Sequence, residues 1–112
     1  MVIKKKCIES IGIKFIEEIK GKEVGRAFLY ILYNDLHEQP FGFLEDVFVE
    51  EAFRNRGIAT SLVSKIIEEA RDRQCYKIIA TSRYSRPSVH ALYRRLGFQD
   101  WGTEFRLNLE KV

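Results

Sequence analysis

The feature that most constrains the fold is a change of hydrophobic period near the middle of the chain. Residues 41–49, FGFLEDVFV, form a mostly apolar run with the length of a strand. After a charged turn, apolar residues recur at helical spacing, at Ala59, Leu62, Val63, Ile66, Ile67 and Ala70. Residues 76–82, YKIIATS, then read as a short buried strand. This order predicts a βαβ unit with two parallel strands and a right-handed crossover.

The segments before this unit predict antiparallel strands. Residues 12–20, GIKFIEEIK, place Ile13, Phe15 and Ile19 on one parity. Residues 26–33 are apolar on both parities, as in a strand that is covered on both faces. The intervening GKEVG, residues 21–25, predicts a hairpin turn.

The segments after the unit predict one more helix and one more strand. Pro87 suits a first helical position, and Gly97 suits the position just after a helix. The apolar stripe between them consists of Val89, Leu92, Tyr93 and Leu96. Residues 103–110, TEFRLNLE, alternate as an antiparallel strand with one wet face does. The class is therefore α/β or α+β, with a mixed, mostly antiparallel sheet built around one βαβ unit.

Length and charge bound what the chain can be. Its 112 residues suit a single domain over 1–112 with one core. Nineteen basic and sixteen acidic residues give a formal net charge of +3, well below the clustered excess of a dedicated nucleic-acid binder. A basic cluster at Lys4–Lys6 is followed by no long apolar segment. We therefore expect neither a signal peptide nor a membrane span, and a soluble cytoplasmic protein.

The two cysteines predict no metal site and no disulfide framework. Cys7 and Cys75 lie far apart, and neither belongs to a CxxC or a Cys/His cluster. Reduced thiols in a cytosolic protein are the simplest interpretation.

The charged turn RNRGIA, residues 54–59, predicts an anion site at the start of the central helix. The first N–H groups of a helix lack intrahelical partners, and the macrodipole adds positive character there. Gly57 lets a ligand approach the backbone closely, while Arg54, Asn55 and Arg56 supply charge and further donors. Neither GxxxxGK[ST] nor GxGxxG is present, which excludes the two most familiar phosphate loops.

The pattern R-x-x-G-x-A, formed by Arg54, Gly57 and Ala59, resembles the pyrophosphate-binding motif of the GNAT superfamily of acyl-CoA-dependent N-acetyltransferases. The segment RPSVHALYRRLGF, residues 86–98, is similar to the later helix of that family, with its closing Tyr-x-x-x-Gly-Phe. CYKIIATS resembles the strand between the two motifs, so the resemblance covers residues 41–110. It implies a GNAT-type mixed sheet.

Two departures from the family pattern concern the acceptor side. Many members carry Asn seven residues before the tyrosine, where this chain has Arg86; together with His90, Arg86 matches a subgroup with R-x-x-x-H spacing. The helices that usually separate the first two strands have no room here, so the N-terminal part is shortened. We therefore expect an open acceptor groove, or one completed in a homodimer. Apolar residues of the first strands, Phe28, Tyr30 and Tyr33, are candidates to face that partner.

The resemblance implies transfer of an acetyl group from acetyl-CoA, the cosubstrate, to a primary amine by direct attack in a ternary complex. The backbone of Phe48 and Val49 would pair with the pantetheine arm like an added strand, with the N–H of Val49, or of a neighbour at the end of that strand, facing the thioester carbonyl. The loop that would hold the pyrophosphate consists of Arg54, Asn55, Arg56, Gly57, Ile58, Ala59 and Thr60. Ser82, in the segment 82–86, is expected to meet the 3′-phosphate or an anionic substrate group; a solvated loop is the alternative.

Tyr93 is implied as the general acid for the leaving thiolate, although a helical aromatic of this kind can also be plain packing. Glu45 and Asp46 resemble the Glu-Asp pair of glucosamine-6-phosphate N-acetyltransferases. Strand alternation sends them to opposite faces, and Glu45 is favoured as the base. Deprotonation through ordered water is the alternative.

Two other functions and several acceptors stay open. A non-catalytic acyl-CoA-binding or interaction module would keep the same fold. A nucleic-acid-associated module would use the basic residues Lys4–Lys6, Arg83, Arg86, Arg94 and Arg95, and steep salt dependence would reveal it. The acceptor can be a small amine, an amino sugar, a polyamine, or a protein N-terminus or lysine.

Overall fold

The computed structural model describes residues 1–110 and contains one four-stranded sheet and two α-helices. The elements in chain order are β1 (Ile11–Ile19), β2 (Lys22–Leu32), β3 (Phe41–Val49), the 3₁₀ helix η1 (Glu51–Phe53), α1 (Ile58–Asp72), β4 (Ile78–Ala80) and α2 (Pro87–Arg95). The contacts cluster into two compact units, one ending at Ala80 and the other beginning at Thr81. A single domain over 1–112 stays a prediction.

The sheet has the order β1-β2-β3-β4, which is also the order of the strands in the chain. β1 pairs antiparallel with β2, β2 antiparallel with β3, and β3 parallel with β4 across α1. The predicted mixed, mostly antiparallel sheet with one βαβ unit is therefore confirmed. β4 is shorter than the predicted 76–82, because only residues 78–80 pair with β3.

The β1–β2 hairpin turn lies earlier than predicted. It consists of Lys20 and Gly21, whose φ angles of 53° and 77° are those of a two-residue type I′ turn. Residues 22–25 belong to β2 instead of the turn. Gly25 is a packing residue, since a Cβ there would come within 2.8 Å of Ile58 Cγ2 on α1.

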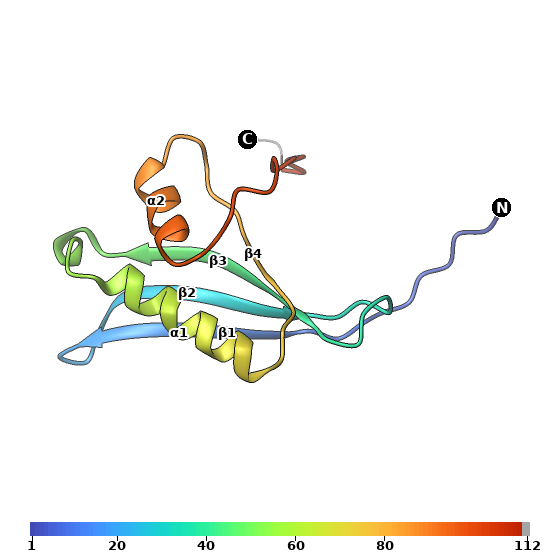
Figure 1. Cartoon of the computed structure of the whole chain (residues 1–112), viewed down its shortest axis with the longest axis horizontal. Helices are drawn as coiled ribbons and strands as arrows, with labels where there is room; N and C mark the ends of the chain where they lie inside the picture. Colours follow the sequence, from blue (N-terminus) through green and yellow to red (C-terminus); the bar gives the residue numbers. More distant parts are fainter. Residues whose placement is uncertain (111–112) are drawn as a thin grey trace. The chain divides into compact units, whose positions relative to one another are not determined.

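The core lies between the sheet and α1, which runs along one face of it (Figure 1). The alternation on β2 places Ala27, Leu29 and Ile31 on the face toward α1 and leaves Arg26, Phe28 and Tyr30 on the other. The fully buried large side chains are Val24, Leu29, Ile31 and Leu44 from the sheet, and Val63 and Ile66 from α1. The predicted apolar stripe of the central helix is thus its buried face.

α1 ends in a Schellman motif. The N–H of Cys75 donates to the Ala70 carbonyl at 2.9 Å, and the N–H of Gln74 donates to the Arg71 carbonyl at 2.9 Å. Gln74 accordingly has a φ of 62°, in the left-handed region that favours glycine.

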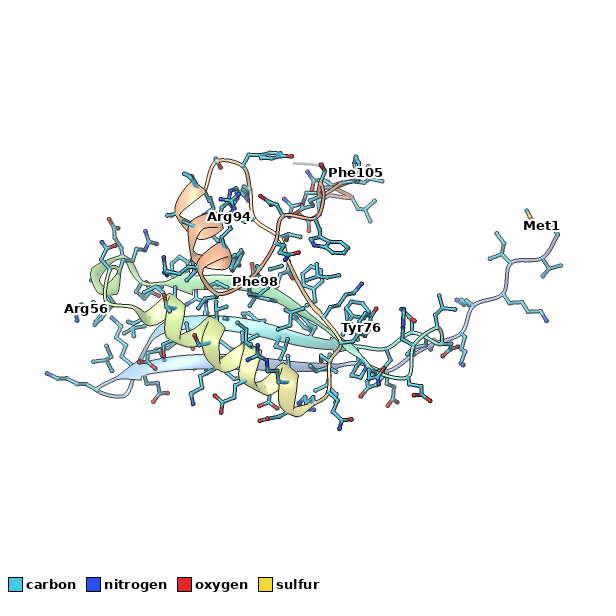
Figure 2. The ribbon with its side chains drawn as sticks, viewed as in Figure 1. Met1, Arg56, Tyr76, Arg94, Phe98 and Phe105 are labelled. Atoms are coloured by element: carbon cyan, nitrogen blue, oxygen red, sulfur yellow. The ribbon has the colours of Figure 1, made fainter. Side chains whose placement is uncertain are left out.

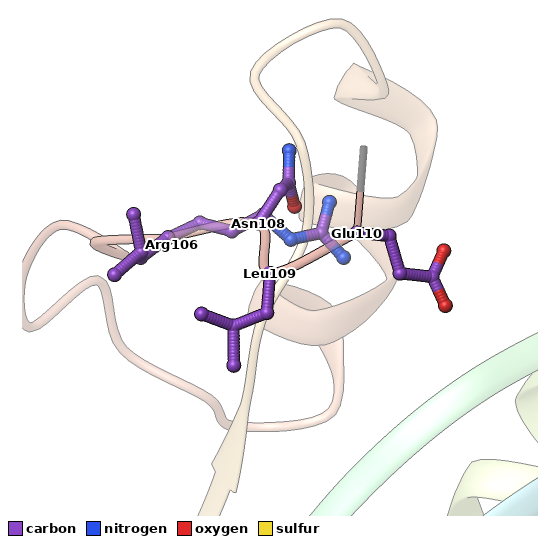
Figure 3. A pocket seen from close by; sticks show the side chains of 5 residues that line it. Arg106, Asn108, Leu109 and Glu110 are labelled. Carbon is purple, nitrogen blue, oxygen red and sulfur yellow. The ribbon is translucent and has the colours of Figure 1, made fainter. Parts of the chain in front are cut away.

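The strand predicted over 103–110 is not formed, and that prediction is wrong for the structure described here. The segment has no strand assignment, and Phe105, Leu107 and Leu109 are 94%, 83% and 90% exposed. Alternation tells which face of a strand would be buried, but a strand also needs a neighbour's backbone, and within residues 1–110 no ladder includes this segment. The hollow in Figure 3 is lined only by consecutive residues of this segment, 106–110, and suggests no site.

Candidate active site

The loop before α1 has the backbone of an anion site. Asn55 and Gly57 both have positive φ, 64° and 82°, and Gly57 is the N-cap of α1. The cap makes no side-chain hydrogen bond, and the first turn carries no acidic residue. A Cβ placed on Gly57 would meet no atom within 4 Å, so the space beside the cap is open. The positive end of α1 is therefore accessible to a ligand.

Two cations of this loop have no carboxylate partner. The Arg54 Nε donates to the Val49 carbonyl at 2.9 Å, and its guanidinium lies 5.6 Å from the centre of the Phe48 ring. Arg56 lies at the turn that leads into α1 (Figure 2). Its guanidinium is 5.1 Å from the centre of the Phe53 ring. Neither guanidinium forms an ion pair within residues 1–110. Cations at a helix N-terminus are unfavourable without an anion, so this arrangement suits an anion-binding site.

The C-terminal half of β3 has one open backbone edge. β4 pairs with Gly42, Phe43 and Leu44 only, and no strand of the described chain lies on that side of residues 45–49. The other edge is closed by β2, ending with the Glu50 N–H that donates to the Val24 carbonyl at 2.8 Å. An open strand edge can pair with an extended ligand. The two residues predicted to do so, Phe48 and Val49, lie in this half of β3, where the Val49 carbonyl already accepts a hydrogen bond from Arg54.

A bulge in β3 changes how the predicted carboxylates are placed. Phe48 lies opposite Arg26 and Glu45 opposite Phe28, so three steps along β3 match two along β2. Asp46, inside the bulge, has a φ of 50°. Glu45 and Phe48 therefore share the face that points away from α1, although simple alternation would separate them. Both carboxylates, of Glu45 and Asp46, are exposed.

Arg26 is a neighbour of the site that sequence reasoning missed. Its guanidinium lies 4.5 Å from the centre of the Phe48 ring, opposite which it stands in the ladder. It also pairs with Glu23 at 3.2 Å and Glu50 at 3.6 Å. The sequence signal that could have identified it is strand alternation, because Arg26 and Phe28 are two residues apart and therefore point to the same face of β2. The Phe48 ring thus has two guanidinium groups, those of Arg26 and Arg54, within cation–π distance, which is favourable for an aromatic ring.

In the second unit, the motif that ends α2 holds Tyr93 in place. The Phe98 N–H donates to the Tyr93 carbonyl at 2.9 Å and the Gly97 N–H to the Arg94 carbonyl at 3.1 Å, with Gly97 at a φ of 101°. This is a Schellman motif, and its usual apolar contact is the packing of the Tyr93 and Phe98 rings, 5.2 Å apart. The predicted helix start and closing glycine are confirmed.

The surroundings of Tyr93 favour its neutral form. Burial raises the pKa of Tyr93, and the positive charge of Arg86 partly offsets this effect. The phenol therefore keeps its proton at neutral pH, as a proton donor must.

Ser82 has a buried hydroxyl without a hydrogen-bond partner in the described chain. Leaving such a group unsatisfied costs about 1–3 kcal/mol, which calls for an explanation. A polar ligand is one. Arg86, four residues on, is exposed, and His90 is half-buried.

The structure thus brings together the predicted residues of the first unit at the end of β3 and the start of α1. Ser82 and Tyr93 lie in the second unit, where each keeps its own surroundings. Within residues 1–110 no three His, Cys, Asp or Glu side chains are grouped as metal ligands. Neither helix has the length and apolar character needed to cross a membrane, as far as residues 1–110 are concerned.

Comparison with known proteins shows which family this chain matches. The model of the Acetyltransferase (GNAT) family matches residues 6–98. A glucosamine 6-phosphate N-acetyltransferase of Trypanosoma brucei brucei is 32% identical over 96 residues, which are 85% of this chain and 63% of that protein. Glucosamine 6-phosphate N-acetyltransferase 1 of Oryza sativa subsp. japonica is 35% identical over 66 residues, 59% of this chain and 38% of the rice protein. The chain therefore spans less than two thirds of the length of these relatives.

A solved structure shares the architecture. AAC(6′)-Iy, in complex with the bisubstrate analogue CoA-S-monomethyl-acetylneamine, has a TM-score of 0.69 and 25% identity, covering 90% of this chain and 69% of that one. The fold, the spacing of the motifs and the family match agree. The chain belongs to the GNAT acetyltransferase family.

Proposed function

We propose that this protein is an N-acetyltransferase that moves the acetyl group of acetyl-CoA to a primary amine by direct attack in a ternary complex. The observation that carries the proposal is the accessible N-terminus of α1, where the N-cap residue Gly57 has a left-handed backbone conformation. Within residues 1–110, Arg54 and Arg56 beside it have no carboxylate partner.

The residues present fit coenzyme A. Backbone N–H groups in the segment 54–60 and the two guanidinium groups suit the pyrophosphate, because both the dipole and the charge favour an anion. The open edge of β3 at Phe48 and Val49 suits an extended arm that carries amide groups, as pantetheine does. The partnerless hydroxyl of Ser82 suits a further polar group of the ligand. When bound, the cofactor supplies an acyl carbon activated as a thioester.

Three tasks then fall to this chain. A backbone N–H at Val49 donates to the oxyanion that forms on the attacked carbonyl. Glu45 accepts a proton from the amine, which has to be neutral to attack although lysine-like amines have a pKa near 10.4. Tyr93, held neutral by its surroundings, donates the phenolic proton to the leaving sulfur. Proton removal by ordered water is the alternative to Glu45, since that carboxylate is exposed.

The acceptor is proposed at the level of its reacting group, a primary amine. Two relatives are named for glucosamine 6-phosphate, so this amino sugar belongs in any substrate panel. A polyamine, an aminoglycoside and a peptide with a free N-terminus represent the other acceptor classes.

Binding of coenzyme A tests the cofactor half of the proposal. Calorimetry should give saturable binding to the wild type, and the double variant Arg54→Gln/Arg56→Gln should bind about tenfold more weakly or worse, because charge-assisted contacts are lost. Arg71→Gln is the matched control, an exposed arginine at the far end of α1, and should bind like the wild type. Absence of binding to folded wild-type protein would refute the proposal.

Release of free thiol from acetyl-CoA, measured over the amine panel, tests the catalytic half. At least one amine should be acetylated, and Tyr93→Phe should lower the rate by a factor of about 10²–10⁴, the usual contribution of a general acid. If coenzyme A binds but no amine is acetylated, the protein is a binding module with the same fold.

A further inference from the structure

The outer edge of β1 is an unpaired strand edge of nine residues, Ile11–Ile19. In the described chain β1 pairs with β2 alone. Its one irregularity, next to Glu17, arises from an extra residue on β2, because Glu17 lies opposite Gly25 and Glu18 opposite Glu23. β1 itself therefore alternates regularly and contains neither proline nor a bulge. Such an edge is a ready template for another strand.

The side chains of β1 include a charge that lacks a partner. Glu18 stands directly opposite Glu23, a like-charged pair that disfavours the ladder. Glu23 is compensated by Lys14 at 3.0 Å and by Arg26 at 3.2 Å. Glu18 forms no ion pair within residues 1–110. The exposed face of β1 thus carries a lysine, an unpaired glutamate four residues on, and Ile16 midway, 46% exposed.

We propose that a second copy of this chain pairs with β1 in antiparallel orientation, about a two-fold axis that is perpendicular to the sheet and passes midway between the two Ile16 residues. Each Lys14 then lies opposite Glu18 of the other copy, so symmetry forms the Lys14–Glu18 charge pair twice. Ile16 lies opposite Ile16, and Ile13 opposite Ile19. The two sheets become one continuous sheet of eight strands.

The register follows from charge. A two-fold axis perpendicular to the sheet keeps both copies of α1 on the same side of the combined sheet. Residues that lie opposite each other then point to the same face, so the axis can be shifted along β1 only by whole residues. Moving it to Lys14 places the two lysines together, and moving it to Glu17 places the two Glu17 together and Lys14 opposite Lys20. Moving it to Phe15 leaves Lys14 opposite Ile16, without a charge partner. Among the axis positions from Lys14 to Glu17, only the one at Ile16 pairs opposite charges.

Charge reversal tests the surface. By sedimentation velocity at micromolar concentration the wild type should be a dimer. Lys14→Glu and Glu18→Lys should each weaken association about tenfold or more, because like charges then meet twice. An equimolar mixture of the two variants should associate again, since every contact in the mixed dimer then joins opposite charges.

Matched controls separate this from a folding defect. Lys65→Glu reverses an exposed lysine on α1 and should leave association unchanged. Circular dichroism should show that both β1 variants are folded; the recovery in the mixture is a readout that a misfolded variant cannot give. A monomeric wild type, or a mixture that stays monomeric, would overturn the proposal.

Disulfide trapping tests the register. In a Cys7→Ser background, Ile16→Cys should give a covalent dimer on mild oxidation, because antiparallel neighbours directly opposite have Cα atoms about 4.5–5.5 Å apart, within disulfide range. Glu18→Cys in the same background is the control, and its two copies are too distant to join. Equal trapping of both, or trapping of Glu18→Cys alone, contradicts an axis midway between the two Ile16 residues.

Discussion

At the scale of single residues, Tyr93 shows how a local motif can prepare a chemical group. The Schellman motif places the Phe98 ring against the tyrosine ring, and half-burial then disfavours the phenolate. The same packing that ends a helix therefore keeps a proton on a candidate acid. A structural role and a catalytic role do not compete at this position, and only a variant that keeps the ring can separate them.

The pKa of Tyr93 leads to a prediction about stability. Because the folded-state pKa is raised above the unfolded value near 10, the folded protein holds this proton more tightly. The contribution is fully present below pH 10 and is lost as the pH rises through the folded pKa. Urea unfolding at pH 8 and near pH 11 should show a larger loss for the wild type than for Tyr93→Phe. Tyr84→Phe, at an exposed tyrosine, should behave like the wild type; an equal loss in all three proteins would contradict the assignment.

At the scale of elements, the two helices end in the same motif with different residues at the left-handed position. α1 has Gln74 there and α2 has Gly97, with φ angles of 62° and 101°. A side chain in this conformation costs about 1–2 kcal/mol, whereas glycine adopts it freely. α1 therefore ends at a residue with a strained backbone conformation, and a substitution that relieves the strain can stabilise the fold.

Exchanging these residues gives opposite expected effects. Gln74→Gly should raise the free energy of unfolding by about 0.5–1 kcal/mol, the strain relieved less the entropy that glycine adds to the unfolded chain. Gly97→Ala should lower it by about 1 kcal/mol or more. Chemical denaturation of both variants beside the wild type measures this. A stabilised Gly97→Ala, or a destabilised Gln74→Gly, would show that the φ angles are not the controlling feature.

The elements also show what the sequence can and cannot predict. The central helix and β3 were predictable because a change of period is a signal carried by many residues at once. The hairpin turn was misplaced because Gly25 looks like a turn glycine but packs against Ile58. The bulge at Asp46 was not predicted because strand alternation assumes that each residue of one strand lies opposite one residue of the next, and a bulge adds an extra residue. The face shared by Glu45 and Phe48 follows from that bulge and could not be predicted without it.

At the scale of the whole molecule, the sequence specifies the proposed cofactor site better than the proposed acceptor site. The anion site depends on a short contiguous segment, residues 54–60, whose chemistry the sequence shows directly. The proposed acceptor site depends on which surfaces come together in the folded chain, and no single contiguous segment specifies it. The predicted strand 103–110 failed for the same reason, because its pairing depends on a neighbour that its own pattern does not name.

The thiols of Cys7 and Cys75 should react with a thiol reagent at different rates. Cys7 is exposed, whereas Cys75 is half-buried and burial raises its pKa, an effect that the charge of Arg73 only partly offsets. At pH 8 a thiol reagent should label one cysteine quickly and the other slowly. Cys7→Ser should remove the fast phase, and Cys75→Ser should remove the slow one. Loss of the fast phase in Cys75→Ser would contradict this order.

The agreement between strand order and chain order has a consequence for how the protein folds. Every strand pairs with the strand next to it in sequence, so most of the sheet closes through short loops. Only the β3–β4 pair has to wait for an intervening helix. Chains rich in local contacts cross the folding barrier faster than those that need distant pairings. We therefore expect the β1–β2–β3 meander to form early, with α1 docking and β4 joining afterwards.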